Sequence, residues 1–352
     1  MENQYIPQAK TPVRIISPYQ PIEEAVIVES TYNNNQGAGR LKPLSGKTAP
    51  FIEANTTAVS LQELERDFIP VFAKDNESSI SHQEFIETVY HAISAVFPRE
   101  TISEIELRVS HKICGRIPSA VGKPANLLEE WEKTQYYERM AFCIEIQSIR
   151  DIISGNELVL SIAGVRAYNH TNLYGKKGLE TFKLAIGFIN RVCTNLCISS
   201  QDGLASEMRV TTTQELYIKS VELLQSYQAQ HHLDSLKVLP SLTLSDTQFA
   251  TLLGRTRLYQ FLPKENQKEL PMLAFGDSQL NMLAKDYYKD KRFCKSEEGY
   301  LNLWNLYNLF TNANRSSSYI DTFLDRGANA YDFITGIASA LNGENTYKWF
   351  IE

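Results

Sequence analysis

Three segments of the chain alternate apolar and polar residues with few interruptions. Between Ile105 and Ile113, apolar side chains stand at nearly every second position, with charged or polar ones between them. The same alternation recurs over residues 142–147 and 182–192. Successive side chains of a β-strand point to opposite faces, so this pattern is typical of strands with one buried and one solvated face. The sequence therefore predicts a sheet with a polar working face.

A β-hairpin gives the predicted topology of this sheet. Ser154-Gly155-Asn156 is a turn signal between strands predicted at 142–149 and 158–165. Together with the strands at 105–113 and 182–192, they form an antiparallel sheet of about four strands. Helices are predicted on both sides of the sheet along the chain, followed by a mostly helical C-terminal region. This order of elements is typical of the α+β class.

The helices are predicted from apolar residues at helical spacing. Ser81 and Glu84 form a capping box for a helix over residues 82–97, and a short acidic helix is predicted at 127–133. The other predicted helices cover residues 61–69, 216–227, 249–258, 278–288, 300–311 and 320–341.

Composition along the chain predicts three regions. Residues 1–57 carry six prolines and an Asn/Gly tract, which predicts a flexible arm with at most a short strand at 25–28. Residues 58–205 are predicted to form the α+β sheet domain. Residues 206–352 are predicted to be a helical region packed on the sheet domain or following it.

Composition and charge restrict the class of protein. The chain is 43% hydrophobic and carries a net charge of -6, which argues against non-specific coating of nucleic acid. Within residues 101–200, however, 12 Lys and Arg stand against 10 Asp and Glu. No apolar stretch is long enough to span a bilayer and the amino terminus lacks a signal sequence, so we expect a cytoplasmic protein with no membrane partner. Its five cysteines are not expected to form structural disulfides.

Catalytic and metal signatures are not evident in the sequence. Cys193 and Cys197 have the wrong spacing for a zinc knuckle and no matching second pair, so we predict a packing role. The Gly-Lys sequences at 122–123 and 175–176 lack the flanking residues of a phosphate-binding loop. We therefore predict no catalytic residue, metal or cofactor, and favour a protein that is not an enzyme, with an unrecognised site as the alternative.

Basic residues gather in and around the predicted strands. They are Arg108, Lys112, Arg116, Arg139, Lys176, Lys177, Lys183 and Arg191, with Tyr136, Tyr137, Tyr168 and Tyr174 close to them in sequence. Cations that follow a phosphate backbone, interleaved with aromatic side chains for base stacking, are typical of single-stranded nucleic-acid binding. The ordinary alternative is a polar sheet face that is solvated or covered by another subunit.

Several segments resemble a known family. Residues 110–118, 136–142 and 192–197 resemble a Bacteroidota family designated domain of unknown function thirty-eight seventy-one, over most of the chain after about Leu61. Residues 302–311, together with residues 192–195, also resemble a broader phage- and plasmid-associated family of unknown function. The resemblance carries no activity to individual residues. It implies a setting on mobile genetic elements, and with it DNA-related work or counter-defence against a host.

Three functional hypotheses follow. The first is a mobile-element protein, able to form a homo-oligomer, that binds nucleic acid, with single-stranded DNA favoured, through the polar face of its sheet. The second is a counter-defence or scaffold protein that binds a host protein through the arm before Thr57 or the helix around Trp304. The third is an enzyme with an unrecognised site, such as a nuclease, for which Glu145, His111 and Arg139 are the first suspects.

Overall fold

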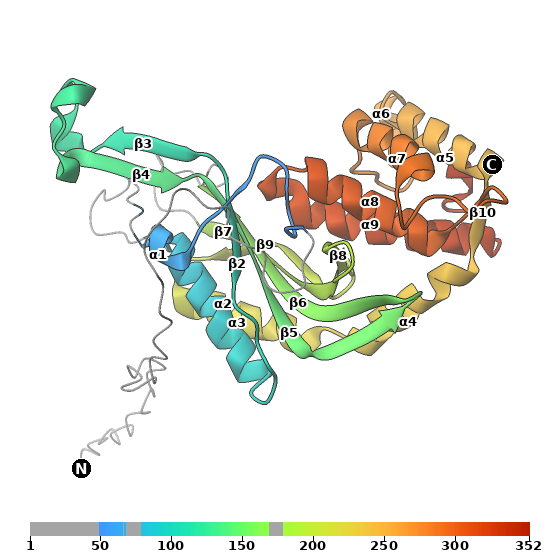
Figure 1. Cartoon of the computed structure of the whole chain (residues 1–352), viewed down its shortest axis with the longest axis horizontal. Coiled ribbons are helices and arrows are strands. Elements are labelled where there is room, and N and C mark those ends of the chain that lie inside the picture. The colour runs from blue at the N-terminus through green and yellow to red at the C-terminus, as the bar shows by residue number, and fades with distance from the viewer. Residues whose placement is uncertain (1–48, 66, 68–78, 169–178) are drawn as a thin grey trace, which may run out of the picture. The chain divides into compact units, whose positions relative to one another are not determined.

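The structure is a computed structural model, drawn in Figure 1, which describes residues 49–65, 67, 79–168 and 179–352. All the described residues belong to one compact unit. The strand predicted at 25–28 lies outside the described residues, as do Lys176, Lys177 and Tyr174.

The described residues form a seven-stranded antiparallel sheet at the centre of the fold. Its order is β1-β2-β5-β6-β7-β8, and β9 pairs with β7 beside β8. The strands are β1 (Thr57–Ala58), β2 (Glu106–Val109), β5 (Arg139–Ile153), β6 (Asn156–Ala167), β7 (Glu180–Asn190), β8 (Asn195–Ile198) and β9 (Leu204–Val210). The α+β class is confirmed, but the predicted number of four strands is too small. The sequence prediction missed β1, β8 and β9 because they are short or lack regular alternation.

The central hairpin follows the prediction. β5 and β6 pair in register from Arg139 with Ala167 to Ile153 with Asn156, with one irregularity near the turn. Ser154 and Gly155 both have positive φ, at 51° and 75°. Two such residues in succession are typical of the tight turn whose twist matches antiparallel strands.

The alternating segment at 105–113 is divided between two sheets. β2 ends at Val109, and the chain then forms β3 (Lys112–Arg116). β3 pairs with β4 (Lys133–Tyr137) in a separate two-stranded sheet. The prediction of one continuous strand was therefore wrong at its second half, because the apolar period is broken by the polar residues between Val109 and Ile113.

We call residues 112–137 the ribbon. Its base is fixed where the Ser110 amide donates to the carbonyl oxygen of Arg139 at 2.9 Å and the Arg139 amide donates to Ser110 Oγ at 3.2 Å. Figure 1 shows the ribbon extending beyond the end of the central sheet, with short turns at its far end. An isolated two-stranded ribbon is only marginally stable in water, so contacts outside its two strands must stabilise it.

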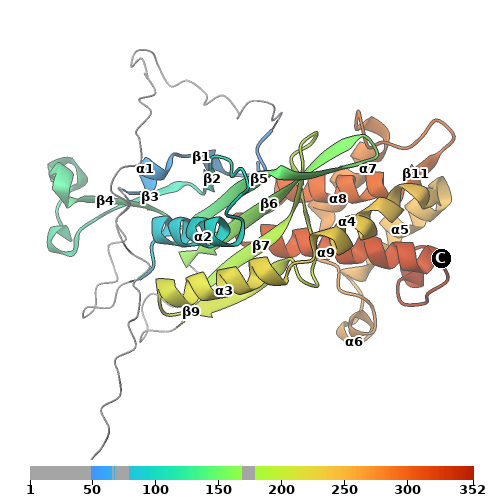
Figure 2. The same ribbon diagram turned by 90° about the horizontal axis from the view of Figure 1, so that it is seen from below.

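Helices and loops cover both faces of the central sheet. Large apolar side chains on one face, such as Phe142 and Phe182, belong to the same core as α2 (His82–Val96) and α3 (Thr213–Ser226), which lie side by side in Figure 2. Small side chains on the other face, such as Ala141, belong to a second core with α9 (Ile320–Leu341). The predicted solvated polar face was therefore wrong for the centre of the sheet.

The C-terminal region is mostly helical, as predicted. Besides α3 and α9, it contains α4 (Ala229–Val238), α5 (Asp246–Tyr259), α6 (Lys264–Lys268), α7 (Asp277–Lys289) and α8 (Leu303–Ser317), with a small β10–β11 pair (Thr243–Ser245 and Tyr300–Asn302). Trp304 in α8 is 0% exposed. The helix around Trp304 is therefore core, and its proposed use as a host-protein interface is wrong.

The helices predicted from local sequence signals before residue 140 are confirmed in some places and wrong in others. The capping box of Ser81 and Glu84 is present at the start of α2. The acidic helix predicted at 127–133 is wrong, because that segment forms short 3-10 turns that lead into β4. Of the helix predicted at 61–69, the described residues show α1 (Leu61–Leu64).

Two residues at the end of the predicted N-terminal arm lie in the core. Phe51 and Ile52 are 0% exposed and belong to the core under α9. These two residues of the predicted arm are therefore part of the core. The division between a sheet domain at 58–205 and a helical region at 206–352 stays a prediction.

A buried histidine gives the fold a predictable response to pH. His232 in α4 is 1% exposed, and its Nδ1 lies 2.7 Å from the Tyr227 hydroxyl. Burial lowers the pKa of His232 from 6.5 to about 4. The unfolded chain takes up this proton near pH 6.5, so between the two pKa values the unfolded state binds more protons and the free energy of unfolding falls as the pH falls.

We expect His232 to account for a loss of about 2 kcal/mol of unfolding free energy between about pH 7 and pH 5. Denaturant unfolding of His232→Phe at the two pH values should show a dependence smaller by that amount. His91→Asn, on the exposed side of α2, is the matched control and should keep the wild-type dependence. An equal pH dependence in wild type and His232→Phe would contradict the prediction.

Candidate nucleic-acid interface

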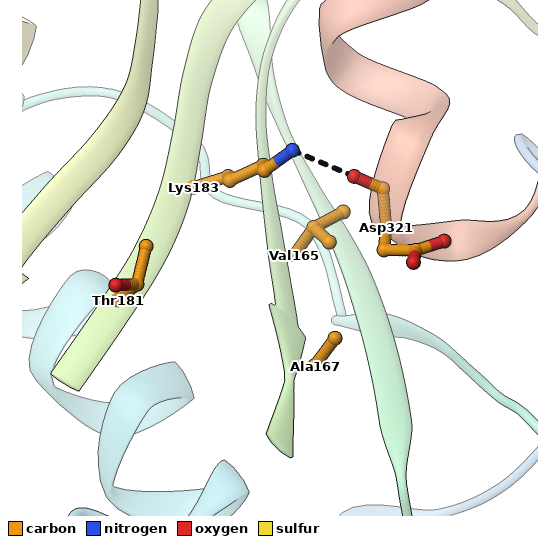
Figure 3. Close-up of a pocket in the computed structure, with 5 residues that line it drawn as sticks. All are labelled: Val165, Ala167, Thr181, Lys183 and Asp321. Carbon is orange, nitrogen blue, oxygen red and sulfur yellow. Dashed lines mark hydrogen bonds between the residues drawn. The ribbon is translucent and has the colours of Figure 1, made fainter. Parts of the chain in front are cut away.

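Lys183 joins the central sheet to α9 instead of facing solvent. Its ammonium donates to the Asp321 carbonyl oxygen at 2.7 Å and to the Asp325 carboxylate. Figure 3 shows the Lys183 side chain reaching across to Asp321, with Val165 beside it. The hollow at this place has a volume of about 10 Å³, enough for a single water at most. No nucleotide can enter there.

Three further predicted cations are also engaged in the body of the protein. Arg191 pairs with the Glu145 carboxylate at 2.9 Å, and that carboxylate is only 3% exposed. Arg139 lies 3.5 Å from both Glu138 and Asp321.

Arg108, the third of these cations, holds the edge of the sheet. It is half-buried, and its guanidinium donates to Thr56 Oγ1 from Nε at 3.0 Å and to the Thr56 carbonyl oxygen at 2.8 Å. Burial lowers the pKa of Arg108 below its usual value. A cation in a largely covered position is stable only when it is paired or hydrogen-bonded. These three residues and Lys183 are therefore accounted for by the fold.

The other two predicted cations that the structure describes lie in the ribbon. A third basic residue, which the sequence prediction missed, lies beside them. β3 and β4 pair with Lys112 opposite Tyr137, Cys114 opposite Gln135 and Arg116 opposite Lys133. Because alternate residues share a face, Lys112, Arg116 and Lys133 lie on one face of the ribbon. We call this the basic face.

Like charges stand directly opposite each other on the basic face. Arg116 faces Lys133 across the ribbon, an arrangement that destabilises an antiparallel pair. Arg116 donates to the carbonyl oxygen of Lys123, and Lys133 pairs with Glu130 at 2.7 Å. The hydrogen bond to Glu130 raises the pKa of Lys133. Since the Glu130 side chain is 89% exposed, this ion pair is easily exchanged for another anion.

Residues 117–132 form the ribbon tip, and Glu132 organises it. Its carboxylate accepts from Lys123 Nζ at 2.6 Å and from the Glu129 amide at 2.7 Å, while its carbonyl oxygen accepts from the Ile117 amide at 3.0 Å. The hydrogen bond from Lys123 lowers the pKa of Glu132 below its usual value. Hydrogen bonds within the tip therefore restrict its conformation.

The aromatic residues expected to stack on bases support the ribbon base instead. Tyr137 and Tyr168 are 7% and 2% exposed, and the ring of Tyr136 packs edge-on against Tyr168 at 6.3 Å. His82 Nε2 lies 2.8 Å from the Tyr137 carbonyl oxygen. Burial lowers the pKa of His82 to about 3, so this ring stays neutral. A buried aromatic cluster thus anchors a ribbon that would be marginal alone.

The suspected catalytic residues do not form one site. Glu145 and Arg139 are six positions apart along β5, roughly 20 Å. His111 lies on the exposed side at the base of the ribbon. Among the described residues, no group of three or more His, Cys, Asp or Glu side chains is placed to hold a metal ion. Cys193 is a free thiol whose pKa burial raises to about 12, which fits a packing role.

These observations define an α+β protein with a covered central sheet and a projecting basic ribbon. A family model described as "Domain of unknown function, B. Theta Gene description (DUF3871)" matches residues 41–351, so the chain belongs to this family. No curated protein and no solved structure matches the chain. None of the helices in the described part of the chain has the length and apolar character needed to cross a bilayer.

Proposed function

We propose that the chain binds nucleic acid through the basic face of the ribbon. The observation that carries the proposal is the direct opposition of Arg116 and Lys133, with Lys112 on the same face, in a ribbon that projects from the body. A polyanion would relieve the repulsion between these cations and add to the few contacts that support the ribbon. The basic residues of the central sheet are not needed for this role.

The preferred form is a duplex. A two-stranded ribbon fits the major groove of B-form DNA, and Gln135 on the basic face can hydrogen-bond to base edges. Single-stranded binding relies on exposed aromatic side chains, whereas Tyr137 and Tyr168 are buried. The ribbon thus favours duplex over the single-stranded DNA expected from the sequence.

The biological setting is part of the same proposal. The resemblance of residues 302–311 and 192–195 to phage- and plasmid-associated proteins is the basis for placing the chain on a mobile genetic element. Work on DNA in the cytoplasm suits that setting.

The proposal predicts salt-dependent binding of a fluorescent duplex of roughly 20 base pairs, measured by anisotropy. Three phosphate contacts would make the affinity fall about fortyfold between about 50 and 200 mM salt. Replacing Lys112, Arg116 and Lys133 together by Ala should weaken binding at low salt and remove most of that dependence. A single strand of the same sequence should bind less tightly than the duplex.

A matched control separates the basic face from net charge. Replacing the exposed Lys285, Lys289 and Lys291 by Ala removes the same charge far from the ribbon and should leave binding unchanged. Equal losses in the two triple variants, or no binding by the wild type at low salt, would contradict the proposal. Circular dichroism of both variants verifies that they are folded.

A further inference from the structure

The ribbon tip exposes large apolar side chains beside carboxylates. Val121, Leu127 and Trp131 are 76%, 58% and 69% exposed. Residues 117–132 contain one Lys and three Glu. Because the hydrogen bonds to Glu132 already fix the tip, docking it on a partner would cost little ordering entropy. A tryptophan on such a surface is typical of the residues that dominate binding energy.

The charge of the tip restricts what it binds. Phosphates of nucleic acid and of anionic lipid surfaces are repelled by Glu129 and Glu130, both of which are exposed. The complementary surface is apolar with a basic rim. Such a surface is present on the same chain.

The second surface lies at the C-terminal end of α5. Leu258 and Phe261 are 58% and 74% exposed and are three residues apart, with the Phe261 amide donating to the Leu258 carbonyl oxygen at 2.9 Å. Residues 254–268 contain four Lys and Arg and one Glu. Arg257 pairs with Asp277 at 3.3 Å, but both side chains are about half exposed, so this pair is readily exchanged. We call Leu258, Phe261, Arg257 and Lys264 the α5 patch.

In both figures the ribbon tip lies at the left end, whereas α5 and α6, the helices on either side of the α5 patch, lie in the right half (Figures 1 and 2). The tip of one copy therefore cannot reach its own α5 patch. We propose that the acidic, apolar ribbon tip of one copy docks on the basic, apolar α5 patch of a second copy. Such a contact is head-to-tail and leaves a tip and a patch unfilled at the two ends, so it continues into a ring or a filament.

Sedimentation equilibrium of the nuclease-treated full chain tests this proposal. The contact is small, so association is expected at roughly 1–100 μM. Trp131→Ala and Phe261→Ala should each weaken it at least about tenfold. Ile152→Ala, which removes a side chain 67% exposed at the β5–β6 turn, should leave it unchanged.

Mixing the two defective chains gives the decisive result. Trp131→Ala retains an intact patch and Phe261→Ala an intact tip, so the mixture should form one-to-one pairs and nothing larger. Charge reversal at Glu129 and Glu130 to Lys should also be rescued by Arg257→Glu with Lys264→Glu in the partner chain. A monomeric wild type, assemblies larger than pairs in the mixture, or association insensitive to both Trp131→Ala and Phe261→Ala would overturn the proposal. The Lys112, Arg116 and Lys133 triple variant should still associate, which separates this contact from nucleic-acid binding.

Discussion

Replacing Glu180 by Ala is expected to lower the free energy of unfolding by about 3–5 kcal/mol. The Glu180 carboxylate pairs with Arg166, whose side chain is 0% exposed, and accepts from the Ile80 amide at 3.0 Å. The Arg166 guanidinium lies between the rings of Tyr168 and Phe182, at 4.5 and 4.6 Å. Removing the carboxylate would leave a buried cation without its counter-charge, which costs far more than the loss of an exposed pair. Denaturant unfolding measures the change.

A surface ion pair is the matched control for Glu180. Glu207 and Arg209 lie 2.8 Å apart on β9, with side chains 65% and 59% exposed. Glu207→Ala should change the unfolding free energy by less than about 1 kcal/mol. Arg166→Met added to Glu180→Ala should recover part of the loss, because it removes the uncompensated charge. Similar losses from Glu180→Ala and Glu207→Ala would show that burial of the pair is not what stabilises it.

The Glu180 pair also bears on the ribbon. Arg166 packs on Tyr168, and Tyr168 in turn contacts Tyr136 of β4. An isolated two-stranded ribbon is marginally stable, so these contacts at its base determine whether the basic face is presented in a fixed register. The buried cluster therefore positions the two strands that carry the proposed interface.

Elements with strong local signals could be predicted from the sequence. The hairpin of β5 and β6 follows from alternation and from the residues at Ser154 and Gly155, which accept positive φ. The bounds of α9 follow from the apolar stripe between Ile320 and Leu341. In each case the information lies within a short window of the chain, so no knowledge of distant contacts is needed.

The covering of the second sheet face could not be predicted, because it depends on residues far apart in sequence. On that face, small side chains such as Ala141 and Ala185 stand beside the charged Lys183. A face exposed to solvent has the same pattern in sequence. Only the packing of α9, more than a hundred residues later, decides between the two. Lys183 and Arg191 therefore seemed available to a ligand but pair with Asp325 and Glu145.

The sequence predicted two of the three cations of the basic face and missed the third, for a similar reason. Lys112 lies in the alternating segment and Arg116 follows it, so both were identified from the sequence. Lys133 joins them only through the pairing of β3 with β4. The segment around Lys133 contains a run of acidic residues that favoured a helical prediction. The like-charged pair of Arg116 and Lys133 is a property of the register, and the sequence alone does not contain it.

Gly187→Ala is expected to lower the free energy of unfolding by about 3 kcal/mol or more. A Cβ at Gly187 would lie 2.0 Å from the Cys197 carbonyl oxygen, a backbone atom of the paired strand β8. Side-chain rotation cannot relieve this contact, so β7 and β8 would have to separate. β8 also carries Asn195, whose side-chain amide donates to the Asn308 carbonyl oxygen of α8 at 3.0 Å. Separation would therefore loosen α8 as well as the sheet.

Gly254→Ala is the control that separates steric contact from the general effect of replacing glycine. Gly254 lies within α5, where an added Cβ meets nothing within 4 Å. Alanine favours a helix interior over glycine by up to about 1 kcal/mol, so this variant should be slightly more stable than the wild type. Opposite signs for the two substitutions, measured by thermal and denaturant unfolding, are the expected result. A small effect of Gly187→Ala would mean that β8 yields easily, and the close pairing of β7 and β8 would then contribute little to the cohesion of the sheet and α8.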